Sequence, residues 1–556
     1  MLPPFLTPKI VTTLQAYDRT QLVNDLIAGL IVGVVAIPLA LAFGISSGVT
    51  PAEGLYAAVI GGFIISLLGG SRVQIGGPTG AFVVIIYGIV TQYGREALTV
   101  CTIMAGVILI VMGLFRMGNL IKWIPYPVTT GFTSGIAVII LSSQVKDLLG
   151  LRMGAIPPDF VDKWGAYFSA LPTIDGATLA LSAATLAVLI FLPRLTKKIP
   201  SPFAALVFAT AAAAIFGLPV ETIGSRFGAL PRGLPMPHLP TVDFKTAAAL
   251  VRPATVVALL AAIESLLSAV VADGMIGSRH RSSMELVAQG VANIASPLFG
   301  GIPVTGAIAR TATNIKSGGR TPVAGITHAL VLVCVLLFAG PLVARIPLCA
   351  LSAVLVIVAY NMSEWHSFFF LLKSPRSDVA VLLTTFGLTV LVDLTVAVEV
   401  GLVLSAFLFM RRIADMTTVS AAVADSGDEE SGGAAEHLSG PLPKGVEVYR
   451  VSGALFFGAA DKLGEILSHI QDPPKVFILR LGSVPVMDAT GQHALRDFQA
   501  RCRRLGTSLL LCGLQKQPLR VLQTSGALSE FDAWTEDDDL PAALKKIKRS
   551  AALLKP

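Results

Sequence analysis

The sequence predicts a polytopic α-helical membrane protein with fourteen spans, arranged as two inverted repeats of seven, followed by a small α/β domain. Of the 556 residues, 54% are hydrophobic and only 14% are charged, a balance that excludes a soluble protein of this length. Several apolar segments reach or approach the roughly 20 residues needed to cross a bilayer. A segment interrupted by Gly and Pro recurs in both halves, as in transporters that are built from repeats.

The interrupted segments are residues 76–81, Gly-Gly-Pro-Thr-Gly-Ala, and residues 300–311, Gly-Gly-Ile-Pro-Val-Thr-Gly-Ala-Ile-Ala-Arg-Thr. The prolines and glycines break helical hydrogen bonding, and such backbone is tolerated at membrane depth only where protein buries it or a water-filled cavity meets it. A helix that starts after the break presents free N–H groups and a positive dipole end. The two segments therefore predict a pair of half-helices that bind an anion, with Arg310 beside them.

Seven apolar spans precede a connection rich in Pro and Gly at residues 218–245, and seven follow it. The first repeat, about 22–217, holds spans at 25–46, 51–68, 79–90, 98–115, 128–148, 177–192 and 203–216. The second repeat, about 252–412, holds spans at 254–272, 286–299, 305–315, 323–343, 348–360, 379–392 and 395–410. Because each repeat has an odd number of spans, the second is inverted relative to the first. Polar residues around 152–163 predict an exterior loop.

Further sequence markers support a duplication of one ancestral repeat. Ala-Ile-Pro at 36–38 matches Ala-Ile-Glu at 262–264, and Ile-Pro at 124–125 recurs at 346–347. Each pair occupies the corresponding place in its repeat, before or within the equivalent span. The whole transmembrane transport domain is expected to cover residues 1–412.

Loop charges orient the spans. Lys and Arg concentrate in the short loops after even-numbered spans, whereas the short loops opposite hold only Arg95 and Arg345. Positively charged loops stay in the cytoplasm, so both termini are expected there. The first 21 residues contain no apolar core of a signal peptide. The net charge of +7 calls for no nucleic-acid partner, and the five cysteines show no metal-ligand spacing, so neither cofactor nor metal is expected.

The remainder of the chain has the composition of a soluble domain. Residues 413–441 are rich in Ser, Gly and Ala with an acidic run, and predict a flexible linker. Residues 442–556 alternate between strand and helix patterns, which predicts a small α/β domain. Asp488 is the expected N-cap of a helix at 488–505. Expected strands are 446–451, 454–457, 475–481 and 508–514, and a further helix is expected at 461–470.

These residues resemble the SulP family of anion transporters, whose animal relatives include pendrin and prestin. The resemblance rests on Asp-Leu-Ile-Ala-Gly-Leu at 25–30, on both Gly-Pro segments, and on Val-Met-Asp-Ala-Thr-Gly at 486–491, which is similar to the start of the signature helix of a STAS domain. It covers nearly the whole chain. It implies core and gate subdomains, elevator-like movement, a homodimer, and a bacterial inner (plasma) membrane location. The STAS-like domain is a candidate binding module for a cytoplasmic protein.

The family's anion site lies between the third and tenth helices. Carried over by motif, the resemblance implies substrate contacts from residues of the first span and of both half-helices. These candidates are Phe43, Thr79, Gly80, Ala81, Ile308, Ala309 and Arg310. Prestin-like members have Ser where this chain has Ala309, which leaves room for anions larger than chloride.

Two charged residues in apolar spans are candidates for distinct roles. Arg310 is expected to balance the charge of the substrate; the alternative is an arginine whose side chain reaches lipid headgroups. Glu264 is a carboxylate in an apolar span, where charge is expensive, and is expected to couple transport to protons. The alternative roles are a structural hydrogen bond, or a sodium site made by Glu264, Ser268 and carbonyls near Thr305.

The sequence thus favours a secondary active transporter of small anions, either of the sulfate type or C4-dicarboxylates, that works as a proton symporter. A sodium-coupled bicarbonate symporter and an anion exchanger or channel are the alternatives. A membrane scaffold that signals through its STAS-like domain is disfavoured by two intact half-helix motifs. No catalytic constellation is present, so an enzyme is not expected. The implied partners are the anion, protons or sodium, and the lipid bilayer.

Overall fold

A computed structural model describes residues 3–118, 125–154, 157, 159–196, 200–231, 233, 235–392, 394–421, 445–456 and 473–536. The chain forms two compact units, Met1–Ser405 and Ala406–Pro556, and each is described by itself. The described part of the first unit is helical apart from two short strands. Seven of its described helices are long and apolar enough to cross a membrane by length and composition, and further helices are shorter.

The described helices occupy the places of the predicted spans in both repeats. The first half contains η1 Pro4–Leu6, α1 Lys9–Thr13, η2 Leu14–Ala16, α2 Arg19–Ser46, α3 Pro51–Leu68, β1 Gly76–Gly77, α4 Gly80–Leu114, α5 Tyr126–Ser143, α6 Val145–Leu149, α7 Phe160–Ala170, η4 Leu171–Thr173, α8 Gly176–Leu195, α9 Ser201–Ile215 and α10 Ile223–Phe227. The second half contains α11 Phe244–Ile276, α12 Ser282–Leu298, β2 Thr305–Gly306, α13 Ile308–Lys316, α14 Pro322–Phe338, α15 Gly340–Val343, α16 Leu348–Met362, α17 Trp365–Leu371, α18 Arg376–Leu391 and α19 Leu394–Met416.

Two features of the first half differ from the expected pattern. The third and fourth predicted spans form one element, α4, that is broken at Gly94, where φ is 84° and ψ is 179°. Only glycine adopts such a conformation readily, so the break is encoded by a single residue. The predicted exterior loop at 152–163 is wrong at its end, because α7 starts at Phe160. Aromatic contacts stabilise this helix, since Trp164 packs edge-on against Phe160 and Tyr167.

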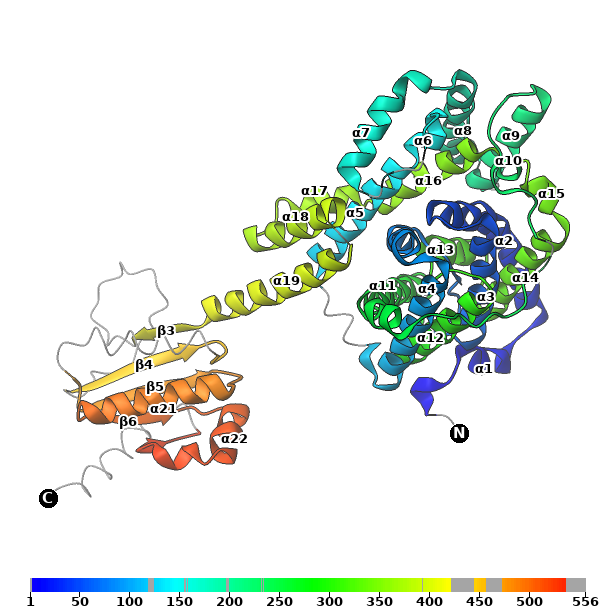
Figure 1. The fold of residues 1–556 in the computed structure, drawn as a ribbon. Coiled ribbons are helices and arrows are strands. Elements are labelled where there is room, and N and C mark those ends of the chain that lie inside the picture. The colour runs from blue at the N-terminus through cyan, green and yellow to red at the C-terminus, as the bar shows by residue number, and fades with distance from the viewer. Residues whose placement is uncertain are drawn as a thin grey trace. The chain divides into compact units, whose positions relative to one another are not determined.

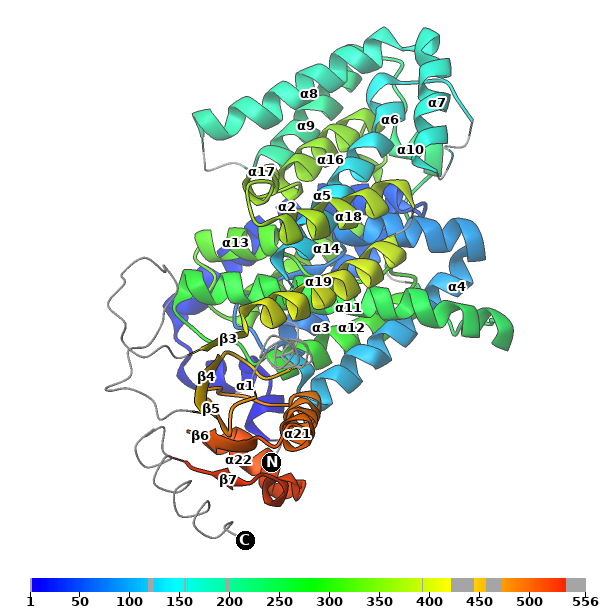
Figure 2. The same ribbon diagram turned by 90° about the vertical axis from the view of Figure 1, so that its left-hand side faces the viewer.

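The two repeats are interleaved rather than side by side. Helix α2 packs against α14, and α11 packs against α4, so corresponding pairs of the two halves make corresponding contacts. Helices α2 to α4 and α11 to α14 form one group (Figure 1). Helix α16 lies between α8 and α2, with α9 on the same side as α8 (Figure 2). This division into two helix groups matches the core and gate subdomains that the resemblance implies.

Close packing within the first group depends on glycine. A Cβ added at Gly106 of α4 would lie 2.7 Å from the carbonyl oxygen of Gly290 on α12 and 2.8 Å from Cγ1 of Ile294. A Cβ added at Gly290 would in turn lie 2.5 Å from the carbonyl oxygen of Gly106. Small residues at such crossings let helix backbones approach closely in membranes, where packing replaces the hydrophobic effect as the force between helices.

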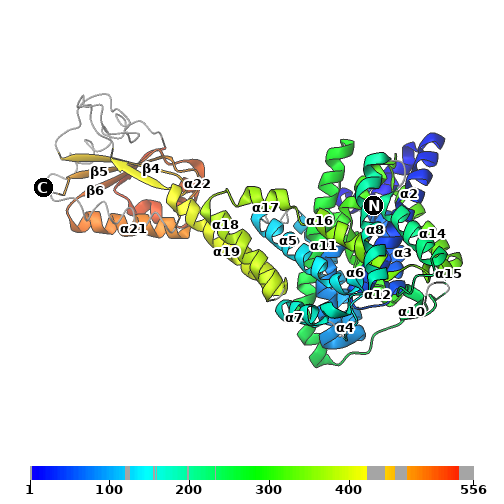
Figure 3. The same cartoon turned by 90° about the horizontal axis from the view of Figure 1, so that it is seen from above.

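The second unit is a five-stranded sheet in the order β3-β4-β5-β6-β7, antiparallel only between β3 and β4. Its elements are β3 Thr418–Ala421, β4 Val446–Ser452, β5 Val476–Ser483, α21 Ala489–Arg504, β6 Ser508–Cys512, α22 Lys516–Thr524, η5 Ala527–Glu530 and β7 Ala533–Trp534. Helix α21 lies along one face of the strands (Figure 3). Tyr449 stacks on Phe477, which meets Phe498 of α21 edge-on and so joins helix to sheet.

Several predictions for this unit need correction or lie outside the described residues. Asp488 caps α21 as predicted, since its Oδ1 accepts from the Gly491 N–H at 2.8 Å. The predicted linker, 413–441, starts too early, because α19 continues to Met416 and β3 extends the sheet by pairing with β4. The predicted strand 454–457 is reduced, in its described part, to one bridge between Leu455 and Met487. The predicted helix 461–470 lies outside the described residues.

The glycine contact between α4 and α12 generates a matched prediction. Replacing Gly106 by Ala is expected to lower the thermal midpoint of the purified protein, because overpacking typically costs about 1–3 kcal/mol. Gly88, also on α4, has nothing within 4 Å of an added Cβ. Gly88→Ala is therefore expected to leave the midpoint unchanged or raise it, because Ala favours helix over Gly by about 1 kcal/mol. Equal midpoints for the two variants would contradict the assigned contact.

Candidate functional site

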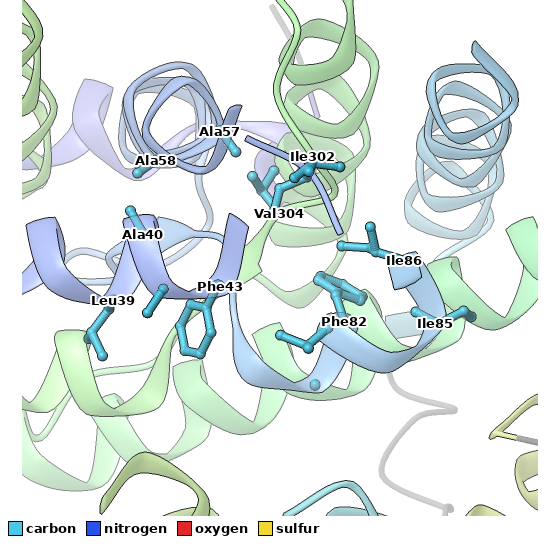
Figure 4. Packing of buried hydrophobic residues seen from close by; sticks show 14 of the residues in the cluster. Leu39, Ala40, Phe43, Ala57, Ala58, Phe82, Ile85, Ile86, Ile302 and Val304 are labelled. Carbon is cyan, nitrogen blue, oxygen red and sulfur yellow. The ribbon is translucent and has the colours of Figure 1, made fainter. Parts of the chain in front are cut away.

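The two interrupted segments meet at the centre of the first helix group. Strands β1 and β2 pair antiparallel, with Gly76 opposite Gly306 and Gly77 opposite Thr305. Ile302 and Val304, which precede β2, lie between Ala57 of α3 and Ile86 of α4 (Figure 4). This pairing satisfies backbone groups of both breaks and sets the starts of α4 and α13 beside each other. The half-helix pair predicted from the sequence is present, although the strand pairing was not predicted.

Neither half-helix is capped by its own N-cap side chain. Thr79 precedes α4 and Ala307 precedes α13, and neither makes a side-chain capping hydrogen bond. First-turn N–H groups have no partner within their helix, and together with the helix dipole they attract an anion. Two such ends side by side provide a more positive location than one.

Arg310 connects the two half-helices. It starts from α13, is only 2% exposed, and its Nη2 donates to the carbonyl of Pro78, which precedes α4. An added Cβ at Gly77 would overlap Nη1, so the path of the guanidinium requires glycine there. Nη1 has no hydrogen-bond partner among the described residues. This burial rules out a side chain that reaches for lipid headgroups, and it leaves one charged donor for a ligand.

Glu264 meets the same dipeptide from the other side. It lies half-buried on α11, and its Oε2 accepts a hydrogen bond from Thr79 Oγ1 at 2.8 Å. Pro78 and Thr79 are thus held between a guanidinium and a carboxylate. The described residues contain no direct ion pair between Arg310 and Glu264. Arg310 and Glu264 therefore contact adjacent residues of one dipeptide.

The remaining predicted contact residues differ in their surroundings. Phe43, Thr79, Gly80 and Ala81 are buried. A Cβ added at Gly80 would lie 3.5 Å from Cε1 of Phe43 and 3.2 Å from both Ile140 Cδ1 and Met362 Sδ. These contacts place the start of α4 against α2, α5 and α16.

On the other half-helix, the predicted contact residues are accessible. Ile308 is 39% exposed, and Ala309, the next residue in the first turn of α13, is exposed as well. Of the two half-helix starts, α13 therefore offers the accessible surface, whereas the start of α4 is covered by neighbouring side chains.

Ser268 is not brought to Glu264 by a hydrogen bond. Its hydroxyl donates to Thr311 Oγ1 at 3.3 Å, and Thr311 Oγ1 also accepts from the N–H of Ile75 at 3.0 Å. The hydroxyl of Thr305 donates to the carbonyl of Ala261 at 2.8 Å. The hydroxyls of Ser268 and Thr305 thus join α11 to α13 and β2. Among the described residues, no group of three or more His, Cys, Asp or Glu could hold a metal ion.

The buried carboxylate of Glu285 was missed by the sequence analysis. It is 0% exposed, and its Oε2 accepts from the N–H groups of Gly70 and Ser71 at 2.8 and 3.1 Å. Its Oε1 accepts from Ser265 Oγ at 3.0 Å and Gln289 Nε2 at 2.8 Å. A Glu in the first turn of a helix usually lies at the surface, so the sequence carried no signal for this network.

Comparisons with known proteins show the family of this chain. A family model described as "Sulfate permease family" matches residues 22–385, and a model of the STAS domain matches residues 441–539. "Putative sulfate transporter YvdB" of Bacillus subtilis is 42% identical over 92% of this chain and 95% of its own length. "Bicarbonate transporter BicA" of Picosynechococcus is 32% identical over 85% of each chain.

The fold is similar to that of a solved structure as well. The structure of SLC26A9 superposes with a TM-score of 0.85, covering 99% of this chain and 94% of that one, at 17% sequence identity. An identity this low supports the fold alone. The family match covers more than half of the chain, and two curated relatives match over most of its length. The chain therefore belongs to the sulfate permease (SulP) family of membrane anion transporters and ends in a STAS domain.

Proposed function

We propose that this protein is a secondary active symporter that moves a small oxyanion, with sulfate as the first candidate, together with a proton. The observation that carries the proposal is the Pro78–Thr79 dipeptide, held between Arg310 and Glu264 at the paired half-helix starts. The proposed substrate contacts are the predicted ones. They are Phe43, Thr79, Gly80, Ala81, Ile308, Ala309 and Arg310.

The hydroxyl of Thr79 supplies a physical link between anion and proton. When Glu264 is ionised, this hydroxyl donates to the carboxylate, and the negative charge repels an incoming anion. Once Glu264 takes up a proton, it becomes neutral and no longer requires that donor. Thr79 can then turn its hydrogen toward the anion, beside the free Nη1 of Arg310. Proton and anion therefore favour each other's binding, as symport requires.

Bicarbonate is the second candidate substrate. It is supported by the relative named a bicarbonate transporter, and it is likewise an oxyanion that suits paired helix starts with one guanidinium. A proton is favoured over sodium as the coupling ion because no second acidic residue lies within a helical turn of Glu264 to balance a cation. An exchanger or channel remains the alternative that needs no coupling ion. We further propose elevator-like movement, a homodimer, an inner-membrane location and cytoplasmic termini.

Uptake into proteoliposomes tests the function directly. Labelled sulfate, bicarbonate and succinate are offered with proton and sodium gradients imposed separately. Sulfate is expected to accumulate when the exterior is acidic and to ignore a sodium gradient. Accumulation driven by sodium alone would overturn proton coupling, and equilibration without accumulation under either gradient would point to an exchanger or channel.

Arg310→Ala is expected to weaken sulfate binding at least about tenfold, since a hydrogen bond to a charged group contributes about 1.5–3 kcal/mol. Lys316→Ala, at the exposed end of the same helix, removes an equal charge and is expected to bind normally. Equilibrium binding of labelled sulfate and thermal midpoints are measured for both. Full affinity in Arg310→Ala would remove this residue from the site.

Glu264→Gln keeps the shape of the side chain without its charge. It is expected to retain anion binding and to lose the acceleration of uptake by an inward proton gradient. Thr79→Val, which lacks the hydroxyl, is expected to blunt the same acceleration, whereas Thr79→Ser preserves it. In the double variant Glu264→Gln with Thr79→Val, the two losses of proton-driven acceleration should not add, because both remove the same hydrogen bond. Sulfate accumulation by Glu264→Gln under a pH gradient alone would exclude this residue as the coupling group.

The STAS domain is expected to be unnecessary for anion binding, because every proposed contact residue precedes Ser405. A truncated variant that ends at Met416, the last residue of α19, lacks the whole sheet. It also lacks β3, which would otherwise lose its partner β4. This truncation is expected to bind sulfate with unchanged affinity and to differ in transport rate or dimerisation. Loss of binding in a truncation that still unfolds cooperatively would show that the site requires the soluble unit.

A further inference from the structure

Three basic side chains gather at one end of the first unit, away from the half-helices. Lys9 lies on α1, Arg72 in the loop between α3 and β1, and Arg281 directly before α12. The positive charges of Arg281 and Arg72 both act on the Lys9 ammonium group. This group of three is called the basic cluster. None of its members belongs to the proposed anion site.

Backbone hydrogen bonds hold the three segments together. The N–H of Lys9 donates to the carbonyl of Gly69 at 3.0 Å, and the N–H of Arg281 donates to the carbonyl of Gly70 at 2.9 Å. Nη1 of Arg281 donates to the carbonyl of Thr7 at 2.7 Å. An added Cβ at Gly70 would overlap the Arg281 carbonyl, so this close approach requires glycine. The fold therefore fixes the backbone of the segments that carry the basic cluster, together with the side chain of Arg281.

The cluster has an excess of positive charge. Burial and the positive charges of Arg281 and Arg72 lower the pKa of the Lys9 ammonium, against a weaker opposite effect from Asp273. Asp273 is itself engaged by the N–H of His280 at 2.8 Å. Among the described residues, no carboxylate forms an ion pair with a member of the cluster. Nε of Arg72 is buried and has no described hydrogen-bond partner. Like charges held this close favour a bound anion.

Exposed apolar side chains adjoin the cluster. Val11 and Leu14, within two turns of Lys9, are 51% and 47% exposed. The guanidinium of Arg116 lies 3.9 Å over the ring of Phe5. Phe115, which precedes Arg116 in the sequence, is also exposed. A small soluble anion has no apolar part that could contact these side chains. A lipid offers a charged headgroup and acyl chains together, as interfacial helices with basic and apolar faces require.

We infer that the basic cluster binds the headgroup phosphate of an anionic phospholipid, with the acyl chains against the neighbouring apolar side chains. This site is separate from the transport site and does not depend on the proposed coupling. Its occupant would stabilise the N-terminal segment against the loop that leads into β1. The shared chemistry is a phosphate group, so the test must distinguish a lipid from free phosphate.

The experiment uses the full-length protein in nanodiscs of phosphatidylcholine, with and without about one fifth phosphatidylglycerol. Retained lipids are counted by native mass spectrometry, and thermal midpoints are recorded. The test variant is Lys9→Gln with Arg72→Gln, and the charge-matched control is Lys373→Gln with Arg376→Gln, two exposed residues before and at the start of α18. We expect phosphatidylglycerol to bind wild type and control, and to bind the test variant at least about tenfold more weakly.

Three outcomes would overturn the inference. The test variant could retain phosphatidylglycerol as well as wild type does, or the control could lose it equally. Inorganic phosphate at millimolar concentration could raise the midpoint of wild type in phosphatidylcholine as much as phosphatidylglycerol does, which would identify free phosphate as the occupant. Lys9→Arg with Arg72→Lys keeps the charge and is expected to restore lipid retention. Failure of this rescue would show that the loss arises from disturbed folding.

Discussion

The antiparallel pairing of β1 with β2 is the interaction on which the site depends. Two interrupted segments from opposite repeats would each expose unpaired backbone groups at membrane depth, which lipid cannot satisfy. Paired with each other, they satisfy these groups and fix the starts of α4 and α13 side by side. Glycine on both strands leaves room for two buried side chains, because an added Cβ would displace Arg310 at Gly77 and Gln74 at Gly306. The two helix starts thus lie side by side because the interrupted segments pair their backbone groups with each other.

Two carboxylates of the first unit, Glu285 and Glu264, differ in the number of hydrogen bonds that they accept. Glu285 accepts four hydrogen bonds, two of them from backbone N–H groups of the neighbouring loop. Glu264 accepts one described hydrogen bond, from Thr79. Our proposal assigns the coupling to Glu264 and not to Glu285, because only Glu264 contacts the Pro78–Thr79 dipeptide.

The sequence predicted those features that rest on local chemistry or on composition. The Gly-Pro interruptions predicted the half-helices, and the apolar runs predicted the spans. Asp488 was correctly predicted as the N-cap of α21. Features made by segments distant in the chain were missed, because no local pattern encodes them. The pairing of β1 with β2, the burial of Glu285 by residues 70–71, and the addition of β3 to the sheet are of this kind. Ser268 was assigned to Glu264 from helical spacing alone, whereas its hydroxyl turns to Thr311.

The loop at residues 69–71 joins the surface of the first unit to its centre. Its Gly69 carbonyl accepts from Lys9 on the outside, and the N–H of Gly70 donates to the buried Glu285 on the inside. Glu285 also accepts from Ser265, which follows Glu264 on α11. A displacement of the N-terminal segment would therefore strain a continuous set of hydrogen bonds that ends one residue from the proposed coupling group. Such hydrogen bonds couple the position of the N-terminal segment to that of α11, because breaking any one of them leaves a buried group unpaired.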